Sequence, residues 1–193
     1  MLSSVLEHPA TLLTSVTELD GVRIGLRLAR RNDAAAVREF LELLSPESRM
    51  RRFGAATPRV ASSLVRHFTT PDGHGRIVVL ATAPIDGTER VVGIADVAFL
   101  RADAAEVAFV VADELHGRGL GRLLAEAAAG LAARRGARRL RADIPLGGQA
   151  ALAIMRSLGP TVAGVEDGAS VAVTVLPVPD EWPASRAHER RAS

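Results

Sequence analysis

The spacing of apolar residues changes several times along the chain, and each change predicts a new element. Residues 22–28 alternate apolar with polar or small side chains, which is the period of a half-buried strand. Apolar side chains then recur at helical spacing after Asn32 or Asp33, either of which can cap a helix. Ser45-Pro46 ends that helix and lets a second begin, because proline is tolerated in a first turn. A third short helix is predicted from Pro58 through Phe68.

The middle of the chain has the composition and period of strands. β-Branched runs at residues 77–81 and 91–97 flank a turn signal at 84–87, so they predict a hairpin. A third strand follows at 106–111, and a long amphipathic helix begins at Leu120. The remaining predicted elements are a strand at 140–144, a helix at 150–158, and strands at 162–166 and 170–176 joined by Asp167-Gly168.

This order of elements predicts an α+β fold, in which helices flank a mixed, mostly antiparallel sheet of about six or seven strands. The strand–helix–strand unit over residues 106–144 requires one parallel pair, because a long crossover joins its two strands. We expect residues 21–176 to form a single domain. Residues 1–20 are expected to be an N-terminal arm or a short helix, and residues 177–193 a flexible, Arg-rich tail.

Composition narrows the classes of function. The chain has 193 residues, 48% of them hydrophobic, so it can bury a core. It has no cysteine and no tyrosine, which excludes disulfides, thiolate nucleophiles and phenol chemistry. Five scattered histidines show no metal-ligand spacing, so no metal is expected. Without a secretion signal or an apolar run of about 18 residues, we expect a cytoplasmic protein that does not enter a membrane.

Every basic residue is an arginine, although the net charge is only +2. A GC-rich genome explains the absence of lysine, and an enzyme that modifies lysines would also benefit from having none. The arginines are dispersed and lack interleaved aromatic residues, so nucleic acid is not an expected partner. The sequence is compatible with a monomer and with a homodimer.

The segment most informative about chemistry joins the strand at 106–111 to the following helix. Its turn reads His116-Gly117-Arg118-Gly119-Leu120-Gly121, and Arg122 follows. Alternating glycines let the backbone approach a ligand closely, and the free N–H groups of a helix start suit a phosphate. Arg118 and Arg122 would add charge-assisted hydrogen bonds. A Walker loop is excluded because it needs lysine, and the glycine spacing does not fit a dinucleotide site.

This turn resembles the Gln/Arg-x-x-Gly-x-Gly/Ala signature of the GNAT acetyltransferases, with His116 in the first place. The resemblance implies a GNAT fold over roughly residues 20–176, with acetyl-CoA as the acyl donor and its pyrophosphate on the amides of the loop. Backbone groups of the preceding strand would meet the pantetheine arm in a wedge opened by a bulge. The residues thus assigned to the cofactor are Phe109, Val110, Val111, His116, Gly117, Arg118, Gly119, Leu120, Gly121 and Arg122.

A narrower resemblance concerns residues 44–53. This segment, Leu44-Ser45-Pro46-Glu47-Ser48-Arg49-Met50-Arg51-Arg52-Phe53, is similar to the Leu-Ser-x-x-Ser-x-x-x-Arg-Phe segment of bacterial Pat-type protein lysine acetyltransferases. The strand at 106–111 also resembles their catalytic strand, where a glutamate serves as general base. The resemblance implies a protein lysine as acceptor and Glu106 as the base. From its residues alone, segment 44–53 could equally be a helix–helix corner with solvated or paired arginines.

Transfer to an amine requires the neutral amine, whereas a lysine ammonium has a pKa of about 10.4. A carboxylate near the thioester can accept that proton. Glu106 is the first candidate, because it begins the strand that leads to the loop. Asp96 and Asp103 are fallback candidates, and His116 is a less favoured acid or base.

Two further features bear on the chemistry. The backbone N–H groups of Val110 or Val111 could stabilise the oxyanion that develops during transfer. Many GNAT enzymes carry a tyrosine that protonates the CoA thiolate, and the equivalent position here is Met155. The CoA thiolate would then take its proton from water or from no group at all.

Three functions remain open at this stage. The first is acetylation of a protein or peptide lysine. The second is acetylation of a small amine, such as a polyamine, an aminoglycoside or an amino acid, which a strongly acidic acceptor groove would favour. The third is a non-catalytic acyl-CoA-binding sensor, which the missing tyrosine suggests.

Overall fold

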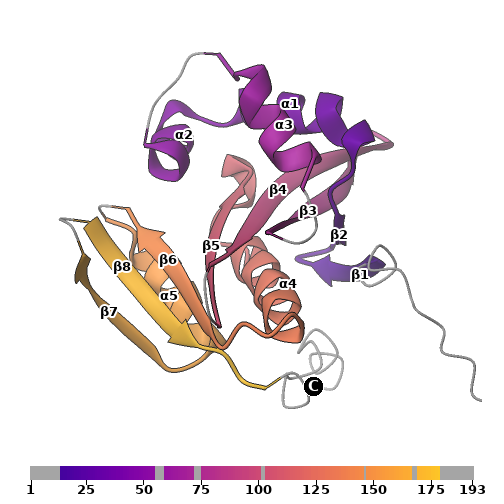
Figure 1. The fold of residues 1–193 in the computed structure, drawn as a ribbon. Coiled ribbons are helices and arrows are strands. Elements are labelled where there is room, and N and C mark those ends of the chain that lie inside the picture. Colours follow the sequence, from indigo (N-terminus) through magenta and orange to yellow (C-terminus); the bar gives the residue numbers. More distant parts are fainter. Residues whose placement is uncertain are drawn as a thin grey trace, which may run out of the picture.

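The computed structural model describes residues 14–54, 59–71, 75–100, 103–145, 147–166 and 169–178. In these ranges the chain forms an eight-stranded sheet with helices on both faces (Figure 1), which confirms the predicted α+β class. The strands and α-helices, in chain order, are β1 (Thr14–Leu19), β2 (Val22–Leu28), α1 (Ala34–Leu43), α2 (Pro46–Phe53), α3 (Ser62–Thr69), β3 (Arg76–Ile85), β4 (Thr88–Phe99), β5 (Ala104–Val111), α4 (Leu120–Arg134), β6 (Arg139–Ile144), α5 (Gln149–Leu158), β7 (Thr161–Glu166) and β8 (Ala169–Val175).

The strands lie in the order β1-β2-β3-β4-β5-β6-β8-β7. Neighbouring strands are antiparallel except β5 and β6, which are parallel as the crossover through α4 requires. The eighth strand, β1, lies where an arm or a short helix was expected. It forms because Asp20 and Gly21 both adopt positive φ, 49° and 77°, and make a two-residue hairpin turn with β2.

The two faces of the sheet carry different helices. α4 and α5 cover one face, and α1, α2 and α3 gather over the other (Figure 1). Phe109 of β5 points to the α4 face, because it lies beside Gly121 of that helix. Asp96 of β4 points to the opposite face, where it meets α2 and α3. Since side chains alternate along a strand and paired residues share a face, Ala108 and Glu106 also point toward the α2 side.

The β3–β4 hairpin is longer than predicted, because only Asp86-Gly87 forms the turn. The register between the two strands shifts between Ala81 and Thr82, which leaves Val92 of β4 as an extra, bulged residue. The register between β4 and β5 is unbroken over Gly93–Phe99 and Ala105–Val111. An opening beside β5 therefore has to come from its other neighbour, β6.

A few predictions fall at the limits of the described ranges. α3 begins at Ser62, four residues later than predicted, and Pro58 lies outside these ranges. The turn at Asp167-Gly168, residues 1–13 and most of the predicted tail also lie outside them. Within them, no helix is both long enough and apolar enough to cross a membrane.

Candidate active site

The turn between β5 and α4 has the backbone geometry of a phosphate-binding loop. A short 3₁₀ helix, Asp113–Leu115, leads into it. Gly117 and Gly119 adopt left-handed conformations with φ of 73° and 90°, which cost energy for any residue with a β-carbon. Gly119 is the N-cap of α4, and no side chain caps the helix there. The first N–H groups of α4 are thus left for a ligand.

Leu120 and Gly121 anchor this turn through close packing rather than by facing a ligand. Leu120 is fully buried in the core. A β-carbon on Gly121 would lie 3.3 Å from Ile154 and 3.9 Å from the ring of Phe109, so the helix start packs closely on β5 and α5. Of these residues, only the backbone groups are available for binding.

The polar side chains of the loop differ in what they contact: His116 meets the backbone of the loop, and Arg118 and Arg122 lie at the surface. The His116 ring nitrogen Nε2 lies 3.2 Å from the carbonyl oxygen of Val111, so His116 shapes the loop. Arg122 pairs with Glu126 one helical turn away, at 2.8 Å. Arg118 is exposed beside the turn. The two arginines can still meet a phosphate, because the Arg122–Glu126 pair is itself on the surface.

A wedge opens between β5 and β6. The described ladder between them covers only Ala104–Glu106 and Arg139–Arg141, after which the two strands diverge toward the loop (Figure 1). The N–H of Ala112 bonds to β4, and successive N–H groups of a strand point to opposite edges, so those of Val111 and Phe109 face the wedge. The same alternation directs the N–H of Val110 toward β4. Phe109 and Val111 are thus favoured over Val110 for contact with a ligand.

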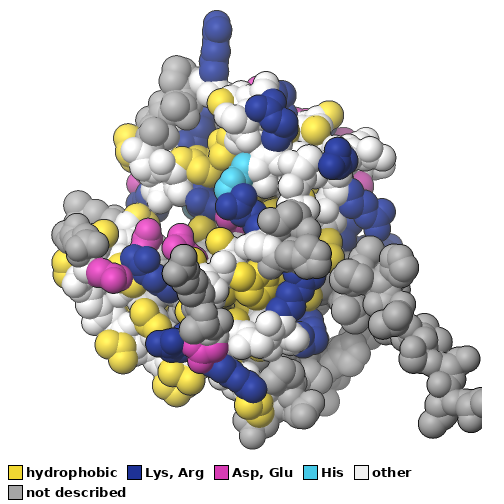
Figure 2. Space-filling view, viewed as in Figure 1, with side chains coloured by type: hydrophobic (Ala, Val, Ile, Leu, Met, Phe, Trp, Pro, Cys, Tyr) yellow, Lys and Arg dark blue, Asp and Glu magenta, His cyan; other side chains and the backbone are white. Residues whose placement is uncertain are grey.

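Glu106 lies at the closed end of this wedge. Its side chain is 40% exposed, and its nearest cation within the described part of the chain is Arg141, with Nη1 3.9 Å from Oε2. Arg141 is closer to two other carboxylates, Asp143 at 3.2 Å and Glu166 at 3.3 Å. Figure 2 shows acidic side chains gathered around basic ones over this part of β6–β8. Glu106 therefore shares its cation with two carboxylates that lie closer to it.

The two fallback carboxylates are already paired. Burial raises the pKa of Asp96, but the hydrogen bond from His67 and the positive charge of Arg52 outweigh it and lower the pKa below its usual range. Asp103 is exposed and accepts a 2.7 Å hydrogen bond from Arg139, which lowers its pKa. Asp103 also lies at the end of β5 away from the loop. Neither residue is placed to act as a base.

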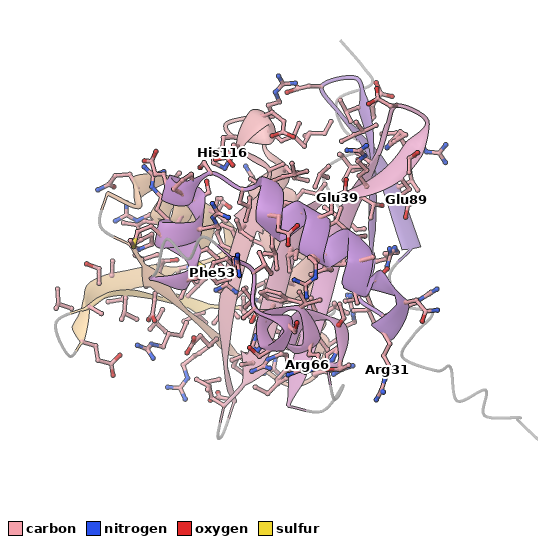
Figure 3. The ribbon with its side chains drawn as sticks, turned by 90° about the horizontal axis from the view of Figure 1, so that it is seen from above. Arg31, Glu39, Phe53, Arg66, Glu89 and His116 are labelled. Carbon is pink, nitrogen blue, oxygen red and sulfur yellow. The ribbon has the colours of Figure 1, made fainter. Side chains whose placement is uncertain are left out.

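Segment 44–53 forms a helix that spans from the loop to β4. The carboxylate of Asp113 accepts hydrogen bonds from Ser45 and Ser48 at its N-terminal end. Arg52 at the other end pairs with Asp96, and Phe53 packs 6.3 Å from the ring of Phe68. Viewed from above, Phe53 and His116 lie toward opposite ends of α2 (Figure 3). Ser45, Ser48 and Arg52 of this segment are thus each paired with a carboxylate of β4 or of the turn after β5.

Met155, at the position of the missing tyrosine, is fully buried in the core, and its thioether has no acidic proton to give to a leaving group. Its carbonyl oxygen accepts hydrogen bonds from Thr161 and Thr174. No three potential metal ligands come together among the residues that the structure describes.

Three residues near the wedge were not singled out from the sequence. Asp113 could have been, because it directly follows a strand and precedes a glycine-rich turn. Arg141 and His67 carry no local signal, since their partners come from other elements. Their roles depend on the tertiary fold.

An open β5 edge that ends in a glycine-rich helix start fits an elongated ligand with phosphates at one end. This is the fold of a GNAT acyltransferase. The profile described as the acetyltransferase (GNAT) family matches residues 37–159, and the chain belongs to that family. It is therefore an acyltransferase that uses acetyl-CoA as its acyl donor.

Solved structures agree with this assignment. The GNAT domain of S. lividans PAT is 30% identical, with a TM-score of 0.77, over 88% of this chain and all of that one. A cAMP-binding acyltransferase from Mycobacterium smegmatis is 25% identical, with a TM-score of 0.60 over 88% of this chain, which spans only 49% of that protein. The acetyltransferase yncA from Salmonella typhimurium, solved with acetyl-CoA, shares the fold at 21% identity and a TM-score of 0.58, over 80% of this chain and 94% of that one. No curated protein matches the chain.

Proposed function

We propose that this protein transfers the acetyl group of acetyl-CoA to the side-chain amine of a protein lysine, with Glu106 as general base. The observation that carries this proposal is the position of Glu106. It lies at the closed end of the wedge, on the α2 side of the sheet, and its nearest cation among the described residues is 3.9 Å away. At the usual rise per residue, roughly 17 Å of strand separate it from Val111, so the arm of the cofactor would lie between loop and base.

The chemistry follows from these positions. Glu106 accepts a proton from the lysine ammonium, directly or through one water, because only the neutral amine attacks a thioester. The amine nitrogen then bonds to the carbonyl carbon, the carbon–sulfur bond breaks, and the nitrogen loses its second proton to water, which leaves the neutral amide. The N–H of Phe109, which faces the wedge and is nearer to Glu106 than that of Val111, stabilises the charge that develops on the carbonyl oxygen. The leaving thiolate takes its proton from water, since Met155 offers none.

The loop and β5 would hold the donor. The amides of Gly117–Gly121 meet the pyrophosphate, with Arg118 and Arg122 adding charge from either side. His116 fixes the loop through the carbonyl of Val111. These roles use the backbone of the turn more than its side chains.

Two observations support a protein acceptor. Segment 44–53 resembles that of Pat-type protein lysine acetyltransferases, and its polar residues are held at both ends beside the wedge. The chain is also 30% identical to the GNAT domain of S. lividans PAT. A small polycationic amine is the second candidate, because Glu106, Asp143 and Glu166 surround a single arginine and leave local negative charge.

The test is a thiol-release assay with acetyl-CoA and two sets of acceptors: proteins with reactive lysines, including acyl-CoA synthetases, and polyamines, aminoglycosides and amino acids. Release with a protein, together with acetyl-lysine located by mass spectrometry, is the expected result. Release with small amines alone would contradict the protein acceptor. Binding of acetyl-CoA without release for any acceptor would favour a sensor.

A further inference from the structure

Asp113 joins two segments that are far apart in the sequence. Its carboxylate accepts hydrogen bonds from the Ser45 N–H at 2.9 Å, the Ser45 hydroxyl at 2.7 Å and the Ser48 hydroxyl at 2.6 Å. Burial raises the pKa of Asp113, but the bonds from Ser48 and Ser45 outweigh it and lower the pKa. Ser48 is buried and Ser45 and Asp113 are half-buried, so water reaches these bonds only in part. The carboxylate is ionised at neutral pH, because its pKa is lowered.

The position of Asp113 links it to the cofactor loop. It begins the 3₁₀ helix directly after β5, and its carbonyl oxygen accepts the N–H of His116, the first residue of the loop, at 3.2 Å. A ligand that orders the loop thus also fixes the backbone that carries the Asp113 carboxylate.

α2 extends from Asp113 to the face of the sheet on which Glu106 lies. Its last turn is held by Arg52, which pairs with Asp96 of β4. Asp96 is paired in register with Ala108, so Asp96 and Glu106 are diagonal neighbours on one face of the sheet. α2 therefore lies beside the side of the wedge from which an amine must approach Glu106.

We propose that Asp113 is a positioning residue that couples the acetyl-CoA loop to α2, so that acetyl-CoA binding orders the acceptor side of the site. This inference rests on the proposed function in one respect, namely that the acceptor approaches from the α2 side. Coupling between two binding sites is reciprocal, so a bound acceptor also tightens acetyl-CoA binding. If Asp113 only stabilised the N-terminus of α2, acetyl-CoA would not order α2 and the acceptor would not tighten acetyl-CoA binding.

Asp33 provides a matched control elsewhere in the protein. Its carboxylate also accepts three hydrogen bonds, from Nη1 and Nη2 of Arg27 at 2.9 and 2.8 Å and from the N–H of Arg30 at 2.6 Å. Its pKa is lowered as well, because these bonds outweigh the effect of burial. Asp33→Asn removes a comparable tether that touches neither α2 nor the loop.

The experiment measures hydrogen–deuterium exchange of the full chain with and without acetyl-CoA, for the wild type, Asp113→Asn and Asp33→Asn. In the wild type, acetyl-CoA should slow exchange in α2 as well as in the loop. Asp113→Asn should keep the protection of the loop and lose that of α2, because it removes the negative charge and puts an N–H₂ group, which cannot accept the Ser45 N–H, in place of Oδ2. Asp33→Asn should behave as the wild type.

Steady-state kinetics give the second readout. Asp113→Asn should raise the KM for the acceptor about tenfold and change the affinity for acetyl-CoA less than about threefold in the absence of acceptor. Ser48→Ala removes one donor and should give the same pattern more weakly, which keeps the test valid if Asp113→Asn folds poorly. α2 exchange that does not respond to acetyl-CoA in the wild type, or protection of α2 that persists in Asp113→Asn, overturns the inference. Exchange needs no turnover, so the coupling can stand even if Glu106 is not the base.

Discussion

The carboxylates of this protein differ in how many hydrogen bonds and ion pairs they make with neighbouring residues. Asp33, Asp96 and Asp113 each accept bonds from neighbouring donors, and their pKa values are lowered despite burial. Glu106 makes only a 3.9 Å contact with Arg141, which is closer to other carboxylates. A base must keep capacity to accept a proton, so the difference in partners favours Glu106 over Asp96.

Gly119→Ala should weaken acetyl-CoA binding about tenfold, because a β-carbon at φ 90° costs roughly 1–2 kcal/mol and distorts the loop. Isothermal titration calorimetry measures the dissociation constant. Gly136→Ala is the matched control, since Gly136 has φ 93° at the other end of α4 with nothing within 4 Å of an added β-carbon. An equal loss of affinity in both variants would show that the loop has no special role.

At the scale of elements, α2 is fixed at both ends by buried or half-buried polar contacts. Arg52 reaches Asp96, which is only 9% exposed, and its guanidinium also lies over the rings of Phe53 and Phe68. These contacts explain why a short helix with four charged residues can pack against the sheet. They also make Arg52 more important for stability than a surface arginine.

Arg52→Ala should lower the free energy of unfolding by about 3 kcal/mol, because it leaves the buried Asp96 carboxylate without its main cation. Urea denaturation followed by circular dichroism measures this change. Arg51→Ala, which breaks only the exposed pair with Glu47, should cost less than about 0.5 kcal/mol. A loss below about 1 kcal/mol for Arg52→Ala would contradict the structural role given to the pair.

Local sequence patterns predicted most of the helices and strands. The bulge and the contacts of the site that were not predicted depend on residues far apart in the sequence. The strand β1 could have been predicted, because Asp20-Gly21 is a strong hairpin signal before an alternating segment. The bulge at Val92 has no comparable signal, since it depends on how β3 pairs with β4. The loop was predicted from its glycines, whereas the bond from Ser45 to Asp113 spans 68 residues and follows only from the fold.

For the whole molecule, the parallel pair β5–β6 is the feature on which the site depends. The ladders from β1 to β5 and from β6 to β7 are antiparallel, and the two halves meet over only three residue pairs. On one face α4 and α5 pack against each other across this junction. The open part of the junction is left for the substrate.

Acid should destabilise the whole molecule in a predictable window. A carboxyl group whose pKa is lowered by folding contributes stability above its unfolded pKa, about 3.9, and loses it as pH falls through the lower folded value. Because the pKa values of Asp33, Asp96 and Asp113 are all lowered, the urea midpoint should hold steady from pH 7 to 5 and fall below about pH 4. Asp33→Asn should show a shallower decline. A midpoint that rises on acidification would contradict these pairings.

The central claim, that Glu106 is the base of an acetyl-CoA-dependent transferase, is tested most directly by Glu106→Gln. Turnover and acetyl-CoA affinity are measured together, with Glu42→Gln, an exposed α1 residue, as control. Glu106→Gln should lower kcat by about 10²–10⁴-fold and leave the dissociation constant for acetyl-CoA nearly unchanged. Turnover of Glu106→Gln within twofold of the wild type would contradict this claim.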